Sequence, residues 1–170
     1  MRNPTTKKYN SGFTLVEALV SLTILTVGLV AGYAAAVSSA GLASSIRNNV
    51  IGTNLAQEGI EVIRAIRDTN WFSGAEFSAG LVPGEYEVTY KSSPALSSYK
   101  DRYMYIKDGG VYQYNLVGVE DGQKTIFKRK ITISNPSPVE LKVVSEVTWN
   151  YRGRDRSVSL ESHLFDWALP

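Results

Sequence analysis

Few residues in this chain are suited to chemistry of their own. The 170 residues include no cysteine and a single histidine, His163. Without cysteine there is no disulfide, no thiol nucleophile and no cysteine-ligated zinc site. A lone histidine argues against a histidine-rich metal site and against a Ser-His-Asp triad. We therefore expect a protein that is not an enzyme and that uses no cofactor or metal.

The carboxylate of Glu17 is the exception, because of the residues that follow it. Glu17 is the only charged residue of the segment 13–46, and no charge occurs from Ala18 to Ile46. A bilayer is crossed by about 20 apolar residues, so Ala18–Val37 is long enough for a membrane-spanning helix. A carboxylate at the start of such a helix is costly in lipid and calls for a partner such as an ammonium group.

The positive charge of the chain is concentrated ahead of this segment. Residues 1–12 hold Arg2, Lys7 and Lys8 and no acid, which leaves 15 basic against 16 acidic residues in the rest. A basic cluster before an apolar stretch predicts a cytoplasmic N-terminus. The overall values of 44% hydrophobic residues, 20% charged residues and a net charge of +2 exclude a disordered tail and a strongly basic nucleic-acid module.

Three interpretations fit a basic stretch followed by an apolar one. They are a plain membrane anchor, a secretory signal peptide cleaved among the small residues near 34–40, and a prepilin. Glu17 argues against the first two, since neither has a use for it. The hexapeptide Gly12-Phe13-Thr14-Leu15-Val16-Glu17 resembles the cleavage and methylation signature of type IV prepilins and type II secretion pseudopilins.

The resemblance implies a role for three residues and a set of partners. Prepilin peptidase would cut between Gly12 and Phe13 on the cytoplasmic face and methylate the new N-terminal amine of Phe13. Glu17 would pair with the N-terminal amine of a neighbouring subunit during assembly. The implied partners are the peptidase, other pilin subunits contacted through the N-terminal helix, the inner-membrane assembly platform and the membrane itself. Nucleic acid is not favoured as a partner.

The resemblance also implies a function and a location. We expect a structural subunit of a type IV pilus or pilus-like filament, and a minor one, because Leu55–Trp71 resembles minor pilins of the pilus-modification type. A type II secretion pseudopilin and a competence-type DNA-uptake minor pilin are the alternatives. The chain would be a single-pass protein of the cytoplasmic (inner) membrane that later enters a surface pilus or a periplasmic pseudopilus.

One long helix would carry the motif. No proline occurs between Pro4 and Pro83, and apolar residues recur at helical spacing beyond the membrane segment, at Ile51, Leu55, Val62 and Ile66. We predict a helix from about Phe13 to about Thr69. The expected organisation is a leader over 1–12, a transmembrane and filament-core half of the helix over 13–42, a packed half over 43–70 and a β domain over 71–170.

Small residues recur every four positions in the first half of this helix, at Gly28, Gly32, Ala36, Ala40 and Ser44. Such spacing allows close helix–helix approach, so we favour a packing ridge in the filament core over an incidental feature of membrane helices. Each helical glycine also lowers helix stability by about 1 kcal/mol. The glycines concerned are Gly28, Gly32, Gly41, Gly52 and Gly59.

The last hundred residues have the alternation of a small antiparallel sheet. This gives an α+β fold class, pilin-like by resemblance, with one sheet face on the second half of the helix. Strands are predicted at Glu85–Lys91, Tyr103–Ile106, Val111–Tyr114, Thr125–Ser134, Val139–Trp149 and around Val158–Leu164. Asp108-Gly109-Gly110 predicts a hairpin, Asn150–Asp155 a turn, and Asn135–Pro138 a loop.

Several side-chain sets in this region could bind a ligand, and a structural interpretation is favoured for each. The tyrosines at alternate positions favour cross-strand pairing and the core edge over a sugar site. For a set of acidic residues, solvated turns are favoured over a calcium site. For a set of basic residues, a solvated strand face is favoured over a DNA-binding surface. The sets are Tyr86, Tyr90, Tyr103, Tyr105, Tyr112 and Tyr114; Asp101, Asp108, Glu120 and Asp121; and Lys128, Arg129, Lys130, Arg152, Arg154 and Arg156. His163 is expected on an exposed strand face and Met104 in the core.

Overall fold

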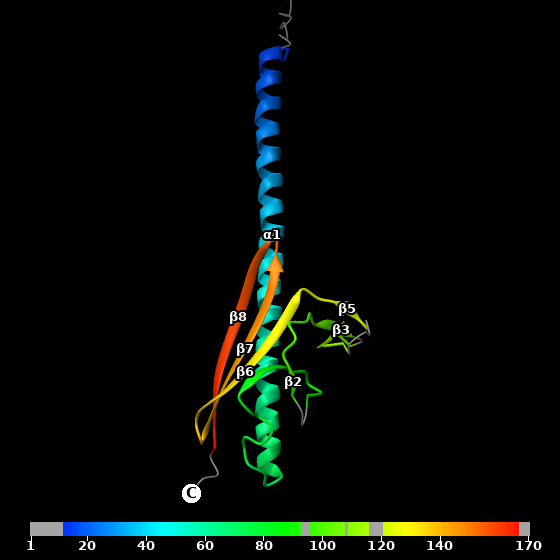
Figure 1. Ribbon diagram of the computed structural model, residues 1–170. Coiled ribbons are helices and arrows are strands. Elements are labelled where there is room, and N and C mark those ends of the chain that lie inside the picture. The colour runs from blue at the N-terminus through cyan, green and yellow to red at the C-terminus, as the bar shows by residue number, and fades with distance from the viewer. Residues whose placement is uncertain (1–11, 93–95, 108, 116–120, 167–170) are drawn as a thin grey trace, which may run out of the picture. The chain divides into compact units, whose positions relative to one another are not determined.

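A computed structural model describes residues 12–92, 96–107, 109–115 and 121–166 (Figure 1). The chain divides into two compact units, residues 1–44 and 45–170, and each is described by itself. One long N-terminal helix, α1 (Leu15–Phe72), is followed by antiparallel β-sheets. The predicted α+β architecture is therefore confirmed.

The two ends of α1 are set by local hydrogen bonds. Leu15 follows Thr14, whose side chain accepts a bond from the first turn. At the other end Gly74 has a φ of 73°, which glycine adopts without strain. The Gly74 amide donates to Trp71 O (3.0 Å) and the Ala75 amide to Asn70 O (2.9 Å). This is a Schellman motif, and it explains why the helix runs past the predicted end at Thr69.

Within the first unit the apolar side chains of α1 contact little protein. Val16, Leu25 and Val30 are 68%, 59% and 69% exposed. The other large apolar residues in this part of α1 are exposed to a similar degree. Among the described residues α1 is the one helix that is long and apolar enough to cross a membrane, judged by length and composition. Such a continuous exposed apolar surface on a soluble monomer would be unusual.

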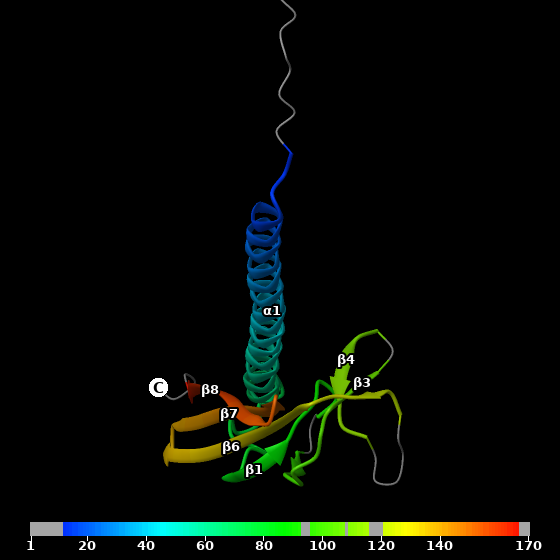
Figure 2. The same cartoon turned by 90° about the horizontal axis from the view of Figure 1, so that it is seen from above.

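The second unit contains two antiparallel sheets. The larger has the order β2-β1-β6-β7-β8 and the smaller has the order β4-β3-β5. Figure 2 shows β6, β7 and β8 side by side, with β3 and β4 set apart from them. The strands are β1 (Gly84–Glu87), β2 (Ser97–Ser98), β3 (Tyr105–Lys107), β4 (Val111–Gln113), β5 (Gln123–Lys124), β6 (Phe127–Ser137), β7 (Glu140–Tyr151) and β8 (Arg154–Phe165).

Alternate residues of the long strands pack on the second half of the helix, as the sequence predicted. One buried cluster joins Ile63 of α1 to Ile131 of β6 and Val143 of β7. A second cluster joins Leu55 of α1 to Trp149 of β7, together with Phe127 and Val147. Burial of these apolar side chains from one helix face and one sheet face supplies the core of the unit.

Two glycines allow this close packing. A Cβ at Gly52 would lie 2.8 Å from Cζ3 of Trp149. A Cβ at Gly59 would lie 2.6 Å from both Ile131 Cδ1 and Ser145 Oγ. Both distances are shorter than van der Waals contact, so the sheet can pack this closely only if these two positions are glycine. Glycine is kept here although it is a weak helix former.

Some predicted element boundaries were wrong. Residues 135–137 belong to β6 rather than to a loop, with a register shift between Ser134 and Ser137. The predicted turn over residues 150–155 is only two residues long, because Tyr151 pairs with Arg154. Arg152 and Gly153 there have φ values of 53° and 75°, the signs of a type I′ hairpin.

The shorter strands also differ from their predicted bounds. The strand predicted at Glu85–Lys91 ends at Glu87. The hairpin predicted around residues 108–110 is confirmed, since β3 and β4 pair antiparallel through Tyr105–Gln113 and Lys107–Val111. Asp108 itself lies outside the described residues.

Candidate functional site

The motif residues lie where an exposed segment meets the start of α1. Gly12, Phe13 and Thr14 precede the first helical residue, and Phe13 is 74% exposed. The peptide bond between Gly12 and Phe13 is therefore neither helical nor covered by protein. A proteolytic enzyme needs that accessibility, because backbone groups engaged in a helix are not free to enter an active site. The basic residues Arg2, Lys7 and Lys8 lie outside the described part of the chain.

Thr14 caps the helix immediately after that bond. Its Oγ1 accepts a hydrogen bond from the Glu17 amide (3.2 Å), and its carbonyl accepts one from the Ala18 amide (3.1 Å). Thr14-x-x-Glu17 has the spacing of a capping box, in which the threonine and the acid three residues later satisfy free helix amides. The capping role of Thr14 was not predicted, although this spacing carries the signal.

Glu17 lies in the first turn of α1 with its carboxylate exposed. Among residues 12–92, 96–107, 109–115 and 121–166, no side chain pairs with it. The first helical turn favours an anion electrostatically, because the free amides there carry partial positive charge. The geometry therefore presents a carboxylate that is available to a cation from outside the described residues.

Residues 7–33 match the model of the prokaryotic N-terminal methylation motif. This is the prepilin-type cleavage and methylation signature of type IV pilins and pseudopilins. The match covers Gly12, Phe13 and Glu17 and the first part of α1. No significant similarity to a curated protein or to a solved structure is found.

The class follows from the motif together with the fold. The motif supports a type IV pilin-like or pseudopilin protein and implies processing by prepilin peptidase and assembly with other pilins. The apolar N-terminal helix and the motif are consistent with a pilin anchored in the inner membrane. The chain thus carries a prepilin-type methylation motif at residues 7–33 and has an α+β architecture.

The small residues predicted to form a packing ridge are exposed on α1. Apart from the adjacent residues and the backbone of α1 itself, no described heavy atom lies within 4 Å of the Cβ position at Gly28 or Gly32, and Ala36 and Ala40 are exposed. Residues spaced by four lie on one side of a helix. The ridge as a site of helix packing between subunits stays a prediction.

The tyrosines do not form one stripe. Tyr86 packs against the cluster around Ile63, whereas Tyr112 and Tyr114 pack against the cluster around Leu55. Tyr90 and Tyr103 are more exposed, at 53% and 39%. The favoured interpretation as the edge of the core therefore describes the first three.

The acidic set is dispersed over salt bridges. Asp101 accepts hydrogen bonds from Lys128 Nζ (2.8 Å) and Tyr99 Oη (2.7 Å), and these bonds hold the pKa of Asp101 below its usual value. Asp121 pairs with Lys107 at 2.8 Å. Asp108 and Glu120 lie outside the described residues. In the described ranges no three His, Cys, Asp or Glu residues are grouped closely enough to hold a metal ion.

Arg129 corrects the prediction for the basic set. It was expected on a solvated strand face, but its side chain is fully buried. Its Nη1 donates to Leu55 O (2.7 Å), and its Nη2 donates to Val88 O and faces Glu58 Oε1 at 3.5 Å. Arg129 shares its strand face with Phe127 and the core isoleucines, so it enters the core and needs these acceptors.

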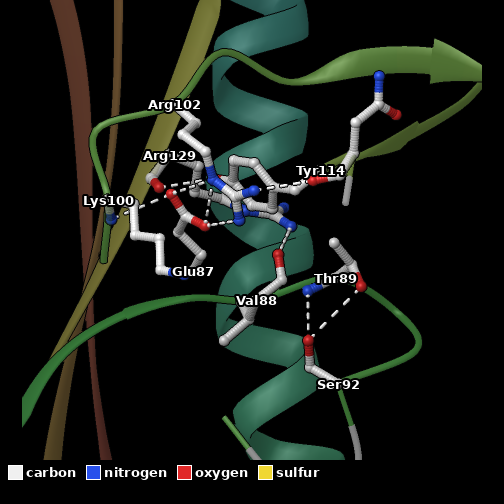
Figure 3. A network of polar contacts seen from close by, with 9 residues as sticks. Glu87, Val88, Thr89, Ser92, Lys100, Arg102, Tyr114 and Arg129 are labelled. Carbon is white, nitrogen blue, oxygen red and sulfur yellow. Dashed lines mark hydrogen bonds and ion pairs between the residues drawn. The ribbon is translucent and has the colours of Figure 1, made fainter. Parts of the chain in front are cut away.

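A second buried charge lies beside Arg129 (Figure 3). The side chain of Glu87 is 1% exposed and is paired with the Arg102 guanidinium. Glu87 Oε1 also accepts a bond from the Lys100 amide (3.1 Å), and Arg102 Nη1 donates to Asn115 O (2.7 Å). The pairing with Glu87 raises the pKa of Arg102. Glu87 is therefore paired with a cation and hydrogen-bonded, and this ion pair connects β1 to the segment before β3.

Tyr114 joins the two charges. Its hydroxyl donates to Arg129 O (2.7 Å), and Arg102 lies 5.5 Å from its ring centroid. Burial raises the pKa of Tyr114 to about 12. The hydroxyl therefore remains a neutral donor across the physiological range.

The remaining predictions for this region hold for most residues. Lys128 and Lys130 are paired on the outer face of β6, with Asp101 and Glu85 respectively. Met104 is fully buried, as predicted. His163 lies on an exposed strand face, also as predicted, and its hydrogen bonds to Glu140 and then Glu161 raise its pKa. Arg152, Arg154 and Arg156 are exposed.

Proposed function

We propose that this protein is a minor subunit of a type IV pilus or pilus-like filament, with a structural and not a catalytic role. The observation that supports this most directly is the methylation motif at 7–33, which falls on an exposed peptide bond just before a capped helix. The first part of that helix is apolar and exposed, as a segment that moves from lipid to a helix-packed filament core requires.

The proposed sequence of events assigns each segment one task. Residues 1–12 are the leader, 13–42 the membrane and filament-core half of the helix, 43–70 the packed half and 71–170 the β domain. The peptidase cuts between Gly12 and Phe13 and methylates Phe13. Glu17 then pairs with the N-terminal amine of a neighbouring subunit, which offsets the cost of its transfer into an apolar filament core.

The first experiment reads the mature N-terminus by mass spectrometry after co-expression of the full chain with a prepilin peptidase. We expect the chain to begin with methylated Phe13. A chain that begins between residues 34 and 41 would show an ordinary secretory signal peptide and would overturn the proposal.

The second experiment separates processing from assembly. Glu17→Ala is expected to be cut normally but to be depleted from purified filaments, since the exposed, unpaired carboxylate is lost. The matched control is Glu61→Ala, which removes an exposed helical carboxylate that is paired within its own helix with Arg64. Equal incorporation of Glu17→Ala and Glu61→Ala would refute the assembly role of Glu17.

The third experiment tests the cleavage position. Gly12→Leu is expected to block processing, because the side chain would fill the space that the peptidase leaves for a hydrogen atom. Among the described residues beyond its chain neighbours, none lies within 4 Å of the Cβ position at Gly12, so the substitution causes no clash with them. A Gly12→Leu chain of mature size on a gel would contradict the assignment.

The type II secretion pseudopilin is an alternative that carries the same signature. The mature protein would then be found in short periplasmic assemblies with secretion components. Recovery of the mature chain in filaments sheared from the cell surface supports the pilus. Its confinement to the periplasm would replace the minor-pilin assignment with that of a pseudopilin.

A further inference from the structure

Basic side chains gather at one end of the second unit. The turn between β7 and β8 carries Arg152, and β8 continues with Arg154 and Arg156. We call these three the tip arginines. Arg156 pairs in register with Trp149, whose ring lies against Gly52 of α1. The tip arginines therefore lie beside the first turns of α1 in this unit, and Figure 1 shows the β7–β8 turn next to that part of the helix.

Arg47 adds a fourth positive charge at this end. It is exposed, and its charge acts on Tyr112, whose ring lies 6.4 Å from that of Phe127. Phe127 is in turn 5.6 Å from Trp149, between ring centroids. Arg47 and Arg156 thus lie near opposite members of one aromatic cluster, Tyr112 and Trp149.

Within the described ranges these four charges form no close ion pairs, and the acids nearest to Arg156 are Asp101, Glu146 and Asp155, which line one cavity with it. Neither Arg47 nor any tip arginine has an ion pair within the described residues. Asp155, the acid between them in sequence, accepts a hydrogen bond from Asn150 (2.8 Å). By contrast, Lys128 in the same cavity is paired with Asp101, and Lys130 and Lys142 elsewhere on the sheet are also paired with carboxylates.

The spacing along α1 indicates what this positive surface faces. No charge occurs between Glu17 and Arg47. Thirty helical steps at about 1.5 Å span about 45 Å, which matches a bilayer of about 40–45 Å with its headgroups. In a chain inserted with Glu17 at the cytoplasmic surface, Arg47 is the first charged residue to follow the apolar segment. Gly52 lies about 8 Å further on, which is within the distance over which charges act at physiological salt.

We propose that Arg47 and the tip arginines bind the anionic phospholipid headgroups of the membrane that holds α1. The inference rests on the proposed membrane insertion of the chain. It gives the β7–β8 turn a second role, as a contact that holds the globular unit on the outer surface of the inner membrane. Each arginine near an anionic surface contributes about a fivefold preference for the docked state.

The absence of cysteine allows a direct test in the full chain. An environment-sensitive fluorophore is attached through Ser157→Cys, next to Arg156 on an exposed part of β8. A reference label is attached through Ser137→Cys at the end of β6. Ser137 pairs with Glu140 and Ser157 with Thr148, so the two labels lie eight residues, about 27 Å, apart along β7. Both proteins are reconstituted into phosphatidylcholine vesicles with and without phosphatidylglycerol, and quenching by headgroup-labelled lipid is recorded.

We expect phosphatidylglycerol to increase quenching at position 157 and not at position 137, with loss of the increase at high salt. Arg154→Ser/Arg156→Ser should reduce the ratio of docked to undocked protein about 25-fold. The matched control Arg64→Ser/Lys91→Ser removes the same charge from half-buried Arg64 and exposed Lys91, away from the β7–β8 turn, and should leave quenching at 157 unchanged.

Three outcomes would count against the inference. Equal quenching in both kinds of vesicle overturns it, as does equal quenching in Arg154→Ser/Arg156→Ser and the control. If the arginine pair instead controls salt-dependent binding of duplex DNA, while anionic lipid has no effect, the surface is a nucleic-acid site. Failure of the parent chain to float with phosphatidylcholine vesicles is a separate result, which refutes membrane insertion itself.

Discussion

Gly59→Ala tests whether the sheet or the helix dictates the glycines of α1. In an isolated helix this substitution stabilises, because alanine is favoured over glycine by about 1 kcal/mol. In this protein the new Cβ would lie 2.6 Å from Ile131 Cδ1 and from Ser145 Oγ, and 3.3 Å from Arg129 Cδ. Three neighbours from two strands cannot all withdraw, because they belong to one packed layer.

Overpacking of this kind costs about 1–3 kcal/mol. Set against the gain in helix propensity, the free energy of unfolding of Gly59→Ala should fall by up to about 2 kcal/mol. Gly28→Ala is the matched control, since nothing lies within 4 Å of its Cβ position. It should leave the unfolding of the second unit unchanged.

The cause can be isolated by removing the two closest atoms. Ile131→Val deletes Cδ1 at a cost of about 0.5–1.5 kcal/mol. Ser145→Ala deletes an Oγ that is buried without a hydrogen-bond partner, so it should cost little or stabilise. In a chain with both substitutions, Gly59→Ala should become stabilising by about 1 kcal/mol.

The assay is urea unfolding of the full chain in detergent micelles, followed by tryptophan fluorescence. Trp149 reports on the relevant core because it is 4% exposed and packs on Phe127. The reasoning is refuted if Gly59→Ala stabilises the parent chain. It is also refuted if its effect is the same with and without Ile131→Val and Ser145→Ala, since a steric cause requires coupling.

Three further predictions concern the polar groups. Arg102→Ala leaves the buried Glu87 carboxylate without its cation and should lower the free energy of unfolding by about 3 kcal/mol, with recovery in Arg102→Ala/Glu87→Gln. Because the pKa of His163 is raised in the folded protein, its contribution to stability is fully present below about pH 6.5 and is lost as the pH rises through the folded pKa. An NMR titration of this single histidine should show a lower pKa in Glu140→Gln. Tyr114→Phe should cost about 1 kcal/mol in urea unfolding, and ultraviolet titration should place Tyr114 ionisation near its raised pKa of about 12.

The periodic features of the chain were predictable, because they depend on neighbouring residues. The apolar spacing of α1 and the alternation in β6 and β7 placed Leu55, Ile131 and Val143 in the core, and the structure buries all three. The prediction of a loop at 135–138 was wrong because of how β6 is paired in the sheet. Pairing of β1 with β6 ends at Ile133, so Pro136 lies where one edge of β6 is unpaired and needs no amide hydrogen.

The features that the sequence did not reveal depend on contacts distant in the chain. Arg129 had an inward position in the alternation, but its acceptors belong to Leu55 and Val88, which no local pattern connects to it. Gly59 likewise looks only unfavourable from its local sequence, because glycine lowers the stability of a helix. Its function appears only when Ile131 is packed against it. The motif at Gly12–Glu17 was readable because all its parts lie within six residues.

The position of β8 has a consequence for how copies of this protein avoid one another. β8 is a 12-residue strand at the edge of its sheet, so one row of its backbone amides and carbonyls is unpaired within that sheet. Long free edges invite aggregation, and natural proteins guard them with charged side chains. Arg154, Arg156 and Glu161 supply such guards here. Removal of the two arginines should therefore promote edge-to-edge association, and the lipid-docking variant must be handled at low concentration and verified as a monomer.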